Sequence, residues 1–272
     1  MFEVQDRSVS VVSVTCDERP ARVEPPADGE VQIWAASLDV DQAAASECAA
    51  CLSADELVRA SRFVAPHDRT RFIVGRAFLR HALAARLGMR PDALRFRYSS
   101  RGKPALESAT GLQFNLAHSA GLAVCAFVDG GAEVGVDVER IKPMGDADAV
   151  ARAVFSPAER ARYETLAGEA RLRAFFEAWT RKEAFLKALG CGLARPLASF
   201  DVAFGPGEPA RLVASRVDLH EVDRVTLDGF EIGDEFVGAV ATLDGPARVQ
   251  LRKWHATEWA WTGSRCDLRV DA

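Results

Sequence analysis

The chain has 272 residues, of which 49% are hydrophobic and 27% are charged, and its formal net charge is −5. This composition excludes a largely disordered chain, and the acidic balance argues against a globally basic nucleic-acid-binding protein. No apolar run reaches the roughly 18 residues that a membrane-spanning helix needs, and the opening MFEVQDRSVS lacks the pattern of a secretory signal. We therefore expect a cytoplasmic protein.

Six cysteines are too few for a disulfide scaffold in a chain of this length, so we expect reduced thiols. Cys48 and Cys51 form a Cys-x-x-Cys motif, but they lie inside the Ala-rich stretch 41–52, and no second pair completes a zinc site. We interpret them as small buried residues of a helix.

The first half of the chain begins with a polar lead-in and then reads as one strand, two helices and a run of strands. Residues 1–30 predict an irregular segment, and 31–38 predict a strand. A capping box, Ser53-Ala-Asp-Glu, opens a helix that ends near Phe63, and a longer helix follows over 67–87. The strand-like segments after it are LRFRYSS, LQFNLAHS, LAVCAFV and AEVGVDVERI.

The second half repeats this order after an interruption at 141–145. A capping box, Ser156-Pro-Ala-Glu, precedes a long helix over 169–189, and strand-like segments come next: FDVAF, RLVAS, VTLDGFEI, FVGAVATL and VQLRKW. Helices followed by strands in each half predict an α+β fold and argue against alternating βαβ units.

We accordingly expect two similar subdomains, although the halves share no strong sequence repeat. Their predicted bounds are 31–141 and 142–252, with a tail over 253–272.

Asp137 and Glu139 are the first candidate functional residues. In the segment GVDVE they alternate with valines, so on a strand both carboxylates share one face while Val136 and Val138 point into the core. Neighbouring carboxylates repel each other unless a cation or proton lies between them, and Mg²⁺ prefers such oxygen ligands. The alternative is a solvated strand face.

The second candidate group lies on the long helix, where Trp179, Glu183 and Lys187 are one turn apart. Phe175 and Trp179 make this stripe apolar towards the start of the helix, so we expect Glu183 at the edge of the core. There it is a plausible third metal ligand, and Lys187 is free to meet an anion. A surface ion pair is the alternative.

Two further sets of polar residues suggest contacts to phosphate. Arg101, Gly102 and Lys103 form a cationic loop in Ser-Arg-Gly-Lys-Pro, and Asn115 and His118 follow in FNLAHS. A basic set lies on the first two helices, with solvated helix faces as the alternative: Arg59, Arg62, Arg69, Arg71 and Arg76.

In this order, the segments RGKP, FNLAHS, GVDVERIKP and FEAWTRKEAFLKALGCGL resemble the 4′-phosphopantetheinyl transferase superfamily, and in particular its Sfp-like group. The resemblance covers about Ser53 to Phe200 and includes neither residues 1–30 nor the tail. It implies two α+β halves packed as a pseudo-dimer, with coenzyme A in the cleft between them.

The resemblance also implies roles for individual residues. Asp137, Glu139 and Glu183 would bind Mg²⁺ (or Mn²⁺), and Glu183 and Lys187 would be catalytic. Lys187 would also contact coenzyme A, together with Arg59, Arg71, Arg101, Gly102, Lys103, Asn115 and His118. Two departures lead us to expect weaker phosphate binding: Ala117, where many members have serine, and Glu56, where some have a basic residue.

The implied reaction moves phosphopantetheine from coenzyme A to a serine of an apo acyl or peptidyl carrier protein. Glu183 would take the serine proton, and Lys187 would stabilise the leaving adenosine 3′,5′-bisphosphate. The chain length favours the broad-specificity single-chain type, so we expect a monomer. Because carrier proteins are acidic, we expect a basic-rimmed apolar docking surface, and we suggest that residues 179–196 form part of it.

Three alternatives remain open at this point. The carboxylates would also suit another Mg²⁺-dependent phosphoryl enzyme, such as a nucleotide pyrophosphohydrolase, although its glutamate-rich helical signature is absent. A non-catalytic protein that binds coenzyme A or a carrier would not need Glu183 as a base. A nucleic-acid-binding module disagrees with the acidic composition.

Overall fold

The structure is a computed structural model that describes residues 10–11, 30–99, 102–108, 110–245, 248–254, 261–262 and 265–266. Most of the expected lead-in and tail therefore lies outside the described residues. In the part of the chain that is described, no helix is both long and apolar enough to cross a membrane.

The first half contains one strand, three helices, a 3₁₀ turn and four strands. In chain order these are β2 (Glu30–Ser37), α1 (Gln42–Ala49), α2 (Ala54–Ala60), α3 (Pro66–Leu87), η1 (Pro91–Ala93), β3 (Phe96–Tyr98), β4 (Pro104–Leu106), β5 (Gln113–Ser119) and β6 (Leu122–Val128). Helix α3 ends where expected because Gly88 adopts φ 64°, a left-handed conformation that glycine reaches without strain.

The second half follows the same order. Its elements are β7 (Glu133–Arg140), α4 (Ala147–Val154), α5 (Pro157–Glu164), α6 (Gly168–Leu189), η2 (Gly192–Ala194), η3 (Leu197–Ser199), β8 (Phe200–Val202), β9 (Leu212–Ser215), α7 (Glu221–Arg224), β10 (Val225–Ile232) and β11 (Phe236–Leu243). The expected α+β fold with two similar halves is confirmed. Helices α4 and α7 and strand β4 were not expected, because elements this short carry too little hydrophobic periodicity.

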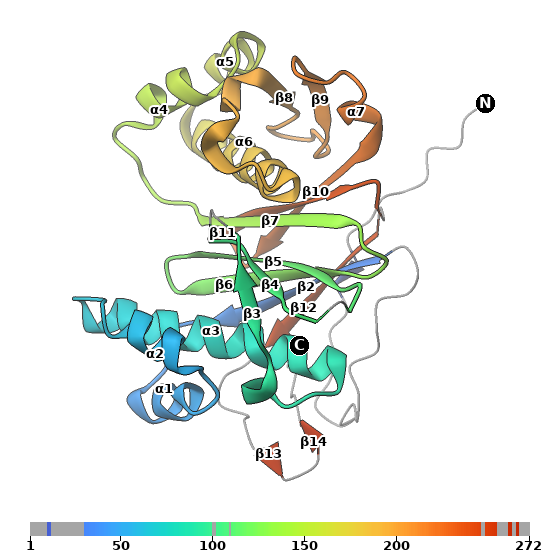
Figure 1. Ribbon diagram of the computed structural model, residues 1–272. Coiled ribbons are helices and arrows are strands. Elements are labelled where there is room, and N and C mark those ends of the chain that lie inside the picture. Colours follow the sequence, from blue (N-terminus) through green and yellow to red (C-terminus); the bar gives the residue numbers. More distant parts are fainter. Residues whose placement is uncertain are drawn as a thin grey trace.

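The molecule has four layers, with two sheets between helices α3 and α6 (Figure 1). One sheet has the order β1-β12-β2-β6-β5, where β1 is Ser10–Val11 and β12 is Arg248–Trp254; the other has the order β10-β11-β7. Short two-stranded sheets complete the described structure: β3-β4, β8-β9 and β13 (Trp261–Thr262) with β14 (Arg265–Cys266).

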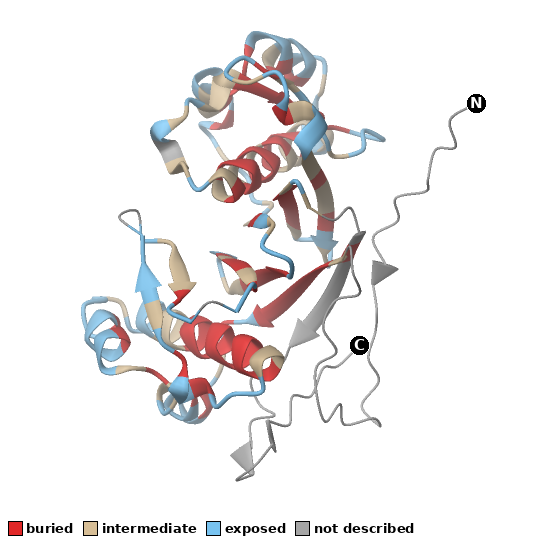
Figure 2. Ribbon diagram, turned by 45° about the vertical axis from the view of Figure 1, so that its right-hand side comes forward, coloured by how far each residue is buried: buried red, intermediate tan, exposed pale blue. Residues whose placement is uncertain are grey.

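Three apolar clusters hold the layers together. Phe78 and Leu83 of α3 pack against Trp34 of the five-stranded sheet, and α6 packs on the outer face of β7 and β11. The third cluster fills the space between the sheets and includes the valines of β7. Figure 2 shows the buried residues concentrated along the long helices and the strands between them.

The strand pairing crosses the expected boundary at residue 141 in both directions. Strand β7, which precedes the boundary, pairs antiparallel with β11 from the second half. Strand β12, which lies mostly within the predicted second half, pairs parallel with β2 from the first half. The boundary itself stays a prediction, but the two halves exchange strands and are not independent sheets.

A buried ion pair in the first half joins three elements. The Glu56 carboxylate caps α2 by accepting the Ser53 N–H at 3.0 Å, and its Oε2 also accepts from Arg80 Nε of α3 at 2.7 Å. Arg80 Nη1 then donates to the carbonyls of Pro91, the first residue of η1, and Leu94, which follows η1.

The second half contains the same arrangement with lysine in place of arginine. Glu159 caps α5 by accepting the Ser156 N–H, and its Oε2 lies 2.8 Å from Lys182 Nζ of α6. Lys182 donates to the carbonyls of Leu197, the first residue of η3, and Phe200, which follows η3. The two halves therefore use equivalent ion pairs to join equivalent elements.

Candidate functional site

The site is built where α6 lies close against β7. The valines of β7 face the core between the sheets, so Gly135, Asp137 and Glu139 share the opposite face, as the alternation predicts. A Cβ atom on Gly135 would lie 2.2 Å from both the Ala184 carbonyl oxygen and the Ala188 nitrogen. Glycine at this position therefore lets the last turns of α6 approach the strand.

This close approach joins Lys187 to Asp137. Lys187 Nζ lies 2.6 Å from Asp137 Oδ1 and also donates to the Val136 carbonyl at 3.1 Å. Asp137 is only 6% exposed, and its second oxygen, Oδ2, is buried without a hydrogen-bond partner. The aspartate therefore has one oxygen paired with a cation and one unpaired.

The charges of two further carboxylates, Glu139 and Glu183, act on Asp137. Burial raises the pKa of Asp137 to about 6 although Lys187 opposes the shift, and the charges of Glu139 and Glu183 raise it further. Burial also raises the pKa of Glu183, against the effect of Lys187 and with a contribution from Glu139. Glu139 thus lies near enough to both Asp137 and Glu183 to raise their pKa values, and Glu183 lies near enough to Asp137 to raise the pKa of Asp137.

Side chains of β5 attach to the edge of β7 that does not face β11. Asn115 Oδ1 accepts the Val136 N–H at 2.9 Å, and Ser119 Oγ accepts the Arg140 N–H at 3.2 Å. Ser119 Oγ also donates to Glu139 Oε2 at 2.5 Å. Asn115, which we predicted to bind coenzyme A, therefore makes a contact between the sheets that positions β7.

The donor set suits a hard divalent cation, although the three carboxylates are not drawn together in this structure. Carboxylate oxygens are the ligands that Mg²⁺ prefers, and the unpaired Oδ2 of buried Asp137 is a place for one. Among the described residues, however, no three His, Cys, Asp or Glu side chains are arranged so that they could hold a metal ion. The cation that contacts Asp137 here is Lys187.

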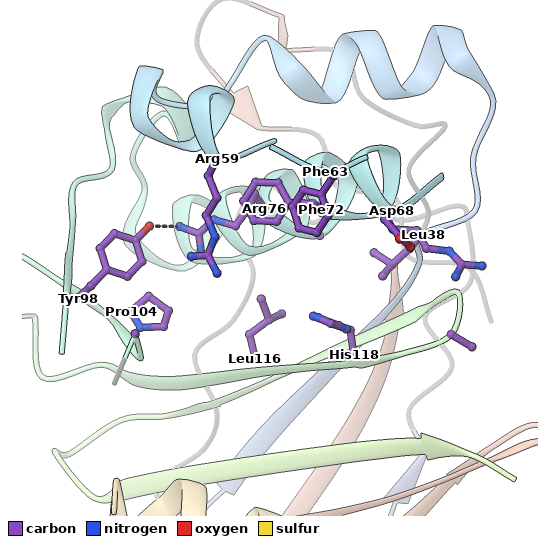
Figure 3. Close-up of a pocket in the computed structure, with 14 residues that line it drawn as sticks. Leu38, Arg59, Phe63, Asp68, Phe72, Arg76, Tyr98, Pro104, Leu116 and His118 are labelled. Carbon is purple, nitrogen blue, oxygen red and sulfur yellow. Dashed lines mark hydrogen bonds between the residues drawn. The ribbon is translucent and has the colours of Figure 1, made fainter. Parts of the chain in front are cut away.

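A cavity of about 460 Å³ lies between α2, α3 and the start of β4 on one side and β5 on the other (Figure 3). Four of the residues predicted to bind coenzyme A line it: Arg59, Arg71, Gly102 and His118. Leu38, Phe63, Asp68, Phe72, Gly75, Arg76, Tyr98, Pro104, Leu116 and Ala120 complete the lining.

The cavity is cationic on its helical side. Arg59 lies over the ring of Phe72, and Arg71 makes two hydrogen bonds to the Asp39 carboxylate, from Nε at 2.7 Å and Nη2 at 3.0 Å. On the opposite side, partial burial and the charge of Lys187 lower the pKa of His118, which Glu139 opposes. His118 therefore links the cavity electrostatically to the carboxylate site.

Lys103, another predicted phosphate ligand, does not line the cavity. Lys103 Nζ donates to the Lys187 carbonyl at 3.2 Å and lies 3.5 Å from Glu133, so it contacts the end of α6 beside the carboxylate site. Arg101 lies outside the described residues.

The two expected departures, Ala117 and Glu56, both occupy buried positions. Ala117 is 4% exposed and belongs to the core between the sheets, because its neighbours Leu116 and His118 take the cavity-facing positions of β5. A serine hydroxyl there would not face the cavity. Glu56 is buried and bonded to Arg76 and Arg80. Its charge also adds to the effect of burial in raising the pKa of Tyr98, so it acts on two residues that line the cavity. The weaker phosphate binding expected from Glu56 stays a prediction.

Arg76 and Tyr98 belong to the cavity, but sequence reasoning did not single them out. Arg76 donates to the Tyr98 hydroxyl at 2.8 Å and to Glu56 Oε1, also at 2.8 Å from Nε. Arg76 was one of five arginines in the basic set, and the sequence contained nothing to separate it from the others. Tyr98 precedes the cationic loop closely, which was a usable signal.

The cysteine motif has no visible role in this chemistry. Cys48 is buried in α1 and Cys51 is half-buried just beyond it, and both are free. Burial raises the pKa of Cys48 to about 11 and that of Cys51 to about 12, so both remain protonated thiols. This agrees with the interpretation of two small packed residues.

Comparisons with known proteins agree on one family. The profile of the 4′-phosphopantetheinyl transferase superfamily matches residues 133–241, and that of the 4′-phosphopantetheinyl transferase N-terminal region matches 38–128. The chain is 42% identical over 186 residues to the 4′-phosphopantetheinyl transferase HetI of Nostoc sp., covering 67% of this chain and 78% of HetI. A 4′-phosphopantetheinyl transferase of Bacillus subtilis is 34% identical over 153 residues, covering 56% of this chain and 66% of that protein.

Among solved structures, a Bacillus anthracis holo-(acyl-carrier-protein) synthase in complex with CoA matches 41% of this chain and 94% of its own, with 21% identity and a TM-score of 0.33. The sequence matches, however, span both halves and include the carboxylate strand, α6 and the cavity. The chain therefore belongs to the 4′-phosphopantetheinyl transferase superfamily.

Proposed function

We propose that this protein transfers 4′-phosphopantetheine from coenzyme A to a serine of an apo acyl or peptidyl carrier protein. The observation that carries the proposal is the pairing of a cationic cavity with a buried carboxylate–lysine site, linked through His118. Membership of the family supports the same conclusion. The by-product is adenosine 3′,5′-bisphosphate.

In this proposal the cavity binds the adenosine 3′-phosphate end of coenzyme A. Arg59, Arg71 and His118 supply its cationic and hydrogen-bonding groups, and Phe72 offers an apolar surface. Lys103 lies beside Lys187 at the end of α6, where it can meet the pyrophosphate. Positioning and charge neutralisation dominate phosphoryl transfer, and these groups supply both.

Asp137, Glu139 and Glu183 would hold Mg²⁺, whose charge would polarise the pyrophosphate. Glu183 accepts the proton of the carrier serine, a role that suits a carboxylate whose pKa is raised by burial. The serine oxygen forms a bond to the phosphorus next to pantetheine as the bond to the bisphosphate breaks. Lys187 neutralises charge on that leaving phosphate.

For the carrier, we retain residues 179–196 as part of the docking surface. Trp179 is half-buried and stacks on Phe175, with ring centroids 6.2 Å apart. Arg195 lies in this segment but its side chain is only 9% exposed, because it pairs with Glu221 and Ser215. The basic rim of the surface must therefore come from other residues.

The test is incubation of the protein with coenzyme A, Mg²⁺ and an apo carrier, followed by mass spectrometry of the carrier. We expect the carrier to gain one phosphopantetheine, and we expect Glu183→Gln to abolish the gain while the protein stays folded. Glu169→Gln is the matched control, because Glu169 is an exposed glutamate in the first turn of the same helix. An active Glu183→Gln enzyme would remove Glu183 from the mechanism.

The same assay separates the alternatives. A pyrophosphohydrolase would cleave coenzyme A without any carrier. A binding protein would retain coenzyme A intact and leave the carrier unmodified.

A further inference from the structure

Lys187 makes an unusual contact for a residue assigned to the leaving phosphate. Its ammonium group is bonded to Asp137 and to the Val136 carbonyl, so two bonds hold it against β7. Asp137 is also the most buried of the three carboxylates that would bind the divalent cation. One aspartate therefore faces two positively charged partners.

We infer that Lys187 and the divalent cation compete for Asp137, and that coenzyme A favours the cation by attracting Lys187 to its phosphates. This inference rests on the proposed function, because it assumes that coenzyme A and the cation meet at this site. It assigns Lys187 a second role, as the residue that couples the binding of the two.

The geometry around Asp137 supports competition. Its Oδ1 is already bonded to the ammonium at 2.6 Å, and its Oδ2 is buried without a partner. A divalent cation at Oδ2 would bring a second positive charge onto the same carboxylate, where the two charges repel each other in a poorly solvated place. Lys187 must then move away before both oxygens of the Asp137 carboxylate are free to bind the divalent cation.

The surrounding charges point the same way. The ammonium of Lys187 contacts Asp137 at 2.6 Å and opposes the rise that burial causes in the pKa of Glu183. The charges of Glu139 and Glu183 act on Asp137. Without the lysine, these carboxylates would attract a cation more strongly. The arrangement therefore weakens cation binding as long as Lys187 stays on Asp137.

Lysine is suited to such an exchange. Its charge is a point on a flexible four-carbon stem, and the Lys187 side chain is 29% exposed, so the ammonium can turn from Asp137 towards solvent. Its backbone is held, because the Lys187 carbonyl accepts from Lys103 and α6 is packed against Gly135. The side chain can thus change partner while the helix stays in place.

Coupling between two ligands is reciprocal. If coenzyme A draws Lys187 away and so tightens cation binding, the cation must tighten coenzyme A binding by the same factor. Direct contact between phosphate and cation would also couple the two. The contribution of Lys187 is therefore best isolated by measuring cation binding without coenzyme A.

The first experiment measures Mn²⁺ binding to the purified protein at pH 8 by the electron paramagnetic resonance signal of free Mn²⁺. We expect Lys187→Met to bind Mn²⁺ about fivefold or more tightly than the wild-type protein, within the usual range of coupling between sites. Lys142→Met is the matched control, because it removes the same charge from an exposed lysine two residues beyond β7 and should change nothing. Unchanged or weaker binding to Lys187→Met overturns the inference, as does the absence of Mn²⁺ binding to both proteins.

The second experiment needs no variant, so it holds even if Lys187→Met does not fold. The wild-type protein is acetylated briefly, with and without Mn²⁺ at a concentration that fills the site, and labelling of Lys187 and Lys142 is compared by mass spectrometry. Release from Asp137 should raise the labelling of Lys187 relative to Lys142, and coenzyme A should then protect it. Equal labelling of Lys187 with the ion bound overturns the inference.

Failure of the inference can be told apart from failure of the proposed function. A wild-type protein that modifies the carrier but gives negative results in both experiments retains its function and loses only the competition. A protein that neither binds coenzyme A nor modifies a carrier loses the proposed function whatever its affinity for Mn²⁺.

Discussion

Asp137 combines features that rarely coexist in a stable protein: it is buried, it has two carboxylate neighbours and one of its oxygens lacks a partner. Such groups cost stability and are concentrated at functional sites. The single ion pair with Lys187 offsets part of that cost. The residue therefore has a measurable signature in the pH dependence of the enzyme.

We expect kcat/KM for coenzyme A to fall on the acid side with an apparent pKa of about 6 at low Mg²⁺, the value to which burial raises the Asp137 carboxyl. A protonated Asp137 cannot bind a cation, so protons and Mg²⁺ compete for its carboxylate. A higher Mg²⁺ concentration should therefore shift the acid limb of the pH–rate profile to lower pH. A pH–rate profile at two Mg²⁺ concentrations tests this. An acid limb near pH 4 that ignores Mg²⁺ would contradict it.

Protonation of Asp137 changes protein stability with pH in the direction opposite to that of a typical ion-paired aspartate, whose pKa is lowered by folding. Because the folded pKa is raised from 3.8 to about 6, the folded protein holds a proton that the unfolded chain has released in this window. The contribution of Asp137 to stability therefore decreases as pH rises through the window.

Gly135 permits the site by lacking a side chain. Gly135→Ala should lower the free energy of unfolding by about 1–3 kcal/mol, the usual cost of overpacking, and should displace the end of α6 that carries Lys187. Urea unfolding measures the first effect and the carrier assay the second. Gly145→Ala is the control, because a Cβ atom there would meet nothing within 4 Å. Equal stability of the two variants would show that α6 does not need this close approach.

At the level of elements, the joint between β5 and β7 determines where the carboxylates lie. Asn115→Ala would leave the buried Val136 N–H without an acceptor, which should cost about 1–3 kcal/mol of unfolding free energy. Urea unfolding and coenzyme A titration should be run together, with Gln113→Ala at the half-buried start of the same strand as the control. Weaker coenzyme A binding without any loss of stability would restore the role in cofactor binding that the sequence suggested.

The sequence predicted some features of the helices and strands but not others. Alternation along β7 predicted the faces of Asp137 and Glu139, and two capping boxes predicted the starts of α2 and α5, because these features depend on near neighbours. The bond from the Val136 N–H to Asn115 could not be predicted, because Val136 lies on another sheet that no local pattern identifies; the coenzyme A contact of Asn115, implied by the resemblance, stays a prediction. Ala117 was misjudged for a related reason, since a strand's period gives two faces but not which one meets the cavity.

The whole molecule contains a second cavity at the position equivalent to the first. It measures about 340 Å³ and lies between α6, the residues before β9 and β10, as the first lies between α3, the residues before β4 and β5. Its charged lining is mainly acidic: Glu177, Glu208, Asp228 and Glu231 against Arg181 and Arg211. Arg181 is also engaged, because it donates to the Ala203 carbonyl.

The two halves therefore have equivalently placed cavities of different charge, and we expect one coenzyme A per chain. Isothermal titration calorimetry should give a stoichiometry of one. Arg71→Ala should weaken binding, whereas Arg211→Ala in the second cavity should not, since repulsion from the acidic lining excludes a polyanion there. A stoichiometry of two would contradict this.

The pairing of β12 with β2 has a consequence for biosynthesis. A ribosome completes residues 30–245 before it makes β12, so until then β2 is the outer strand of its sheet, with Val31 and Ile33 buried on it in the finished protein. An exposed outer strand readily pairs with other chains. The nascent protein is thus most prone to aggregate when nearly all of both halves has emerged, and a chaperone that shields this strand would matter most at that moment.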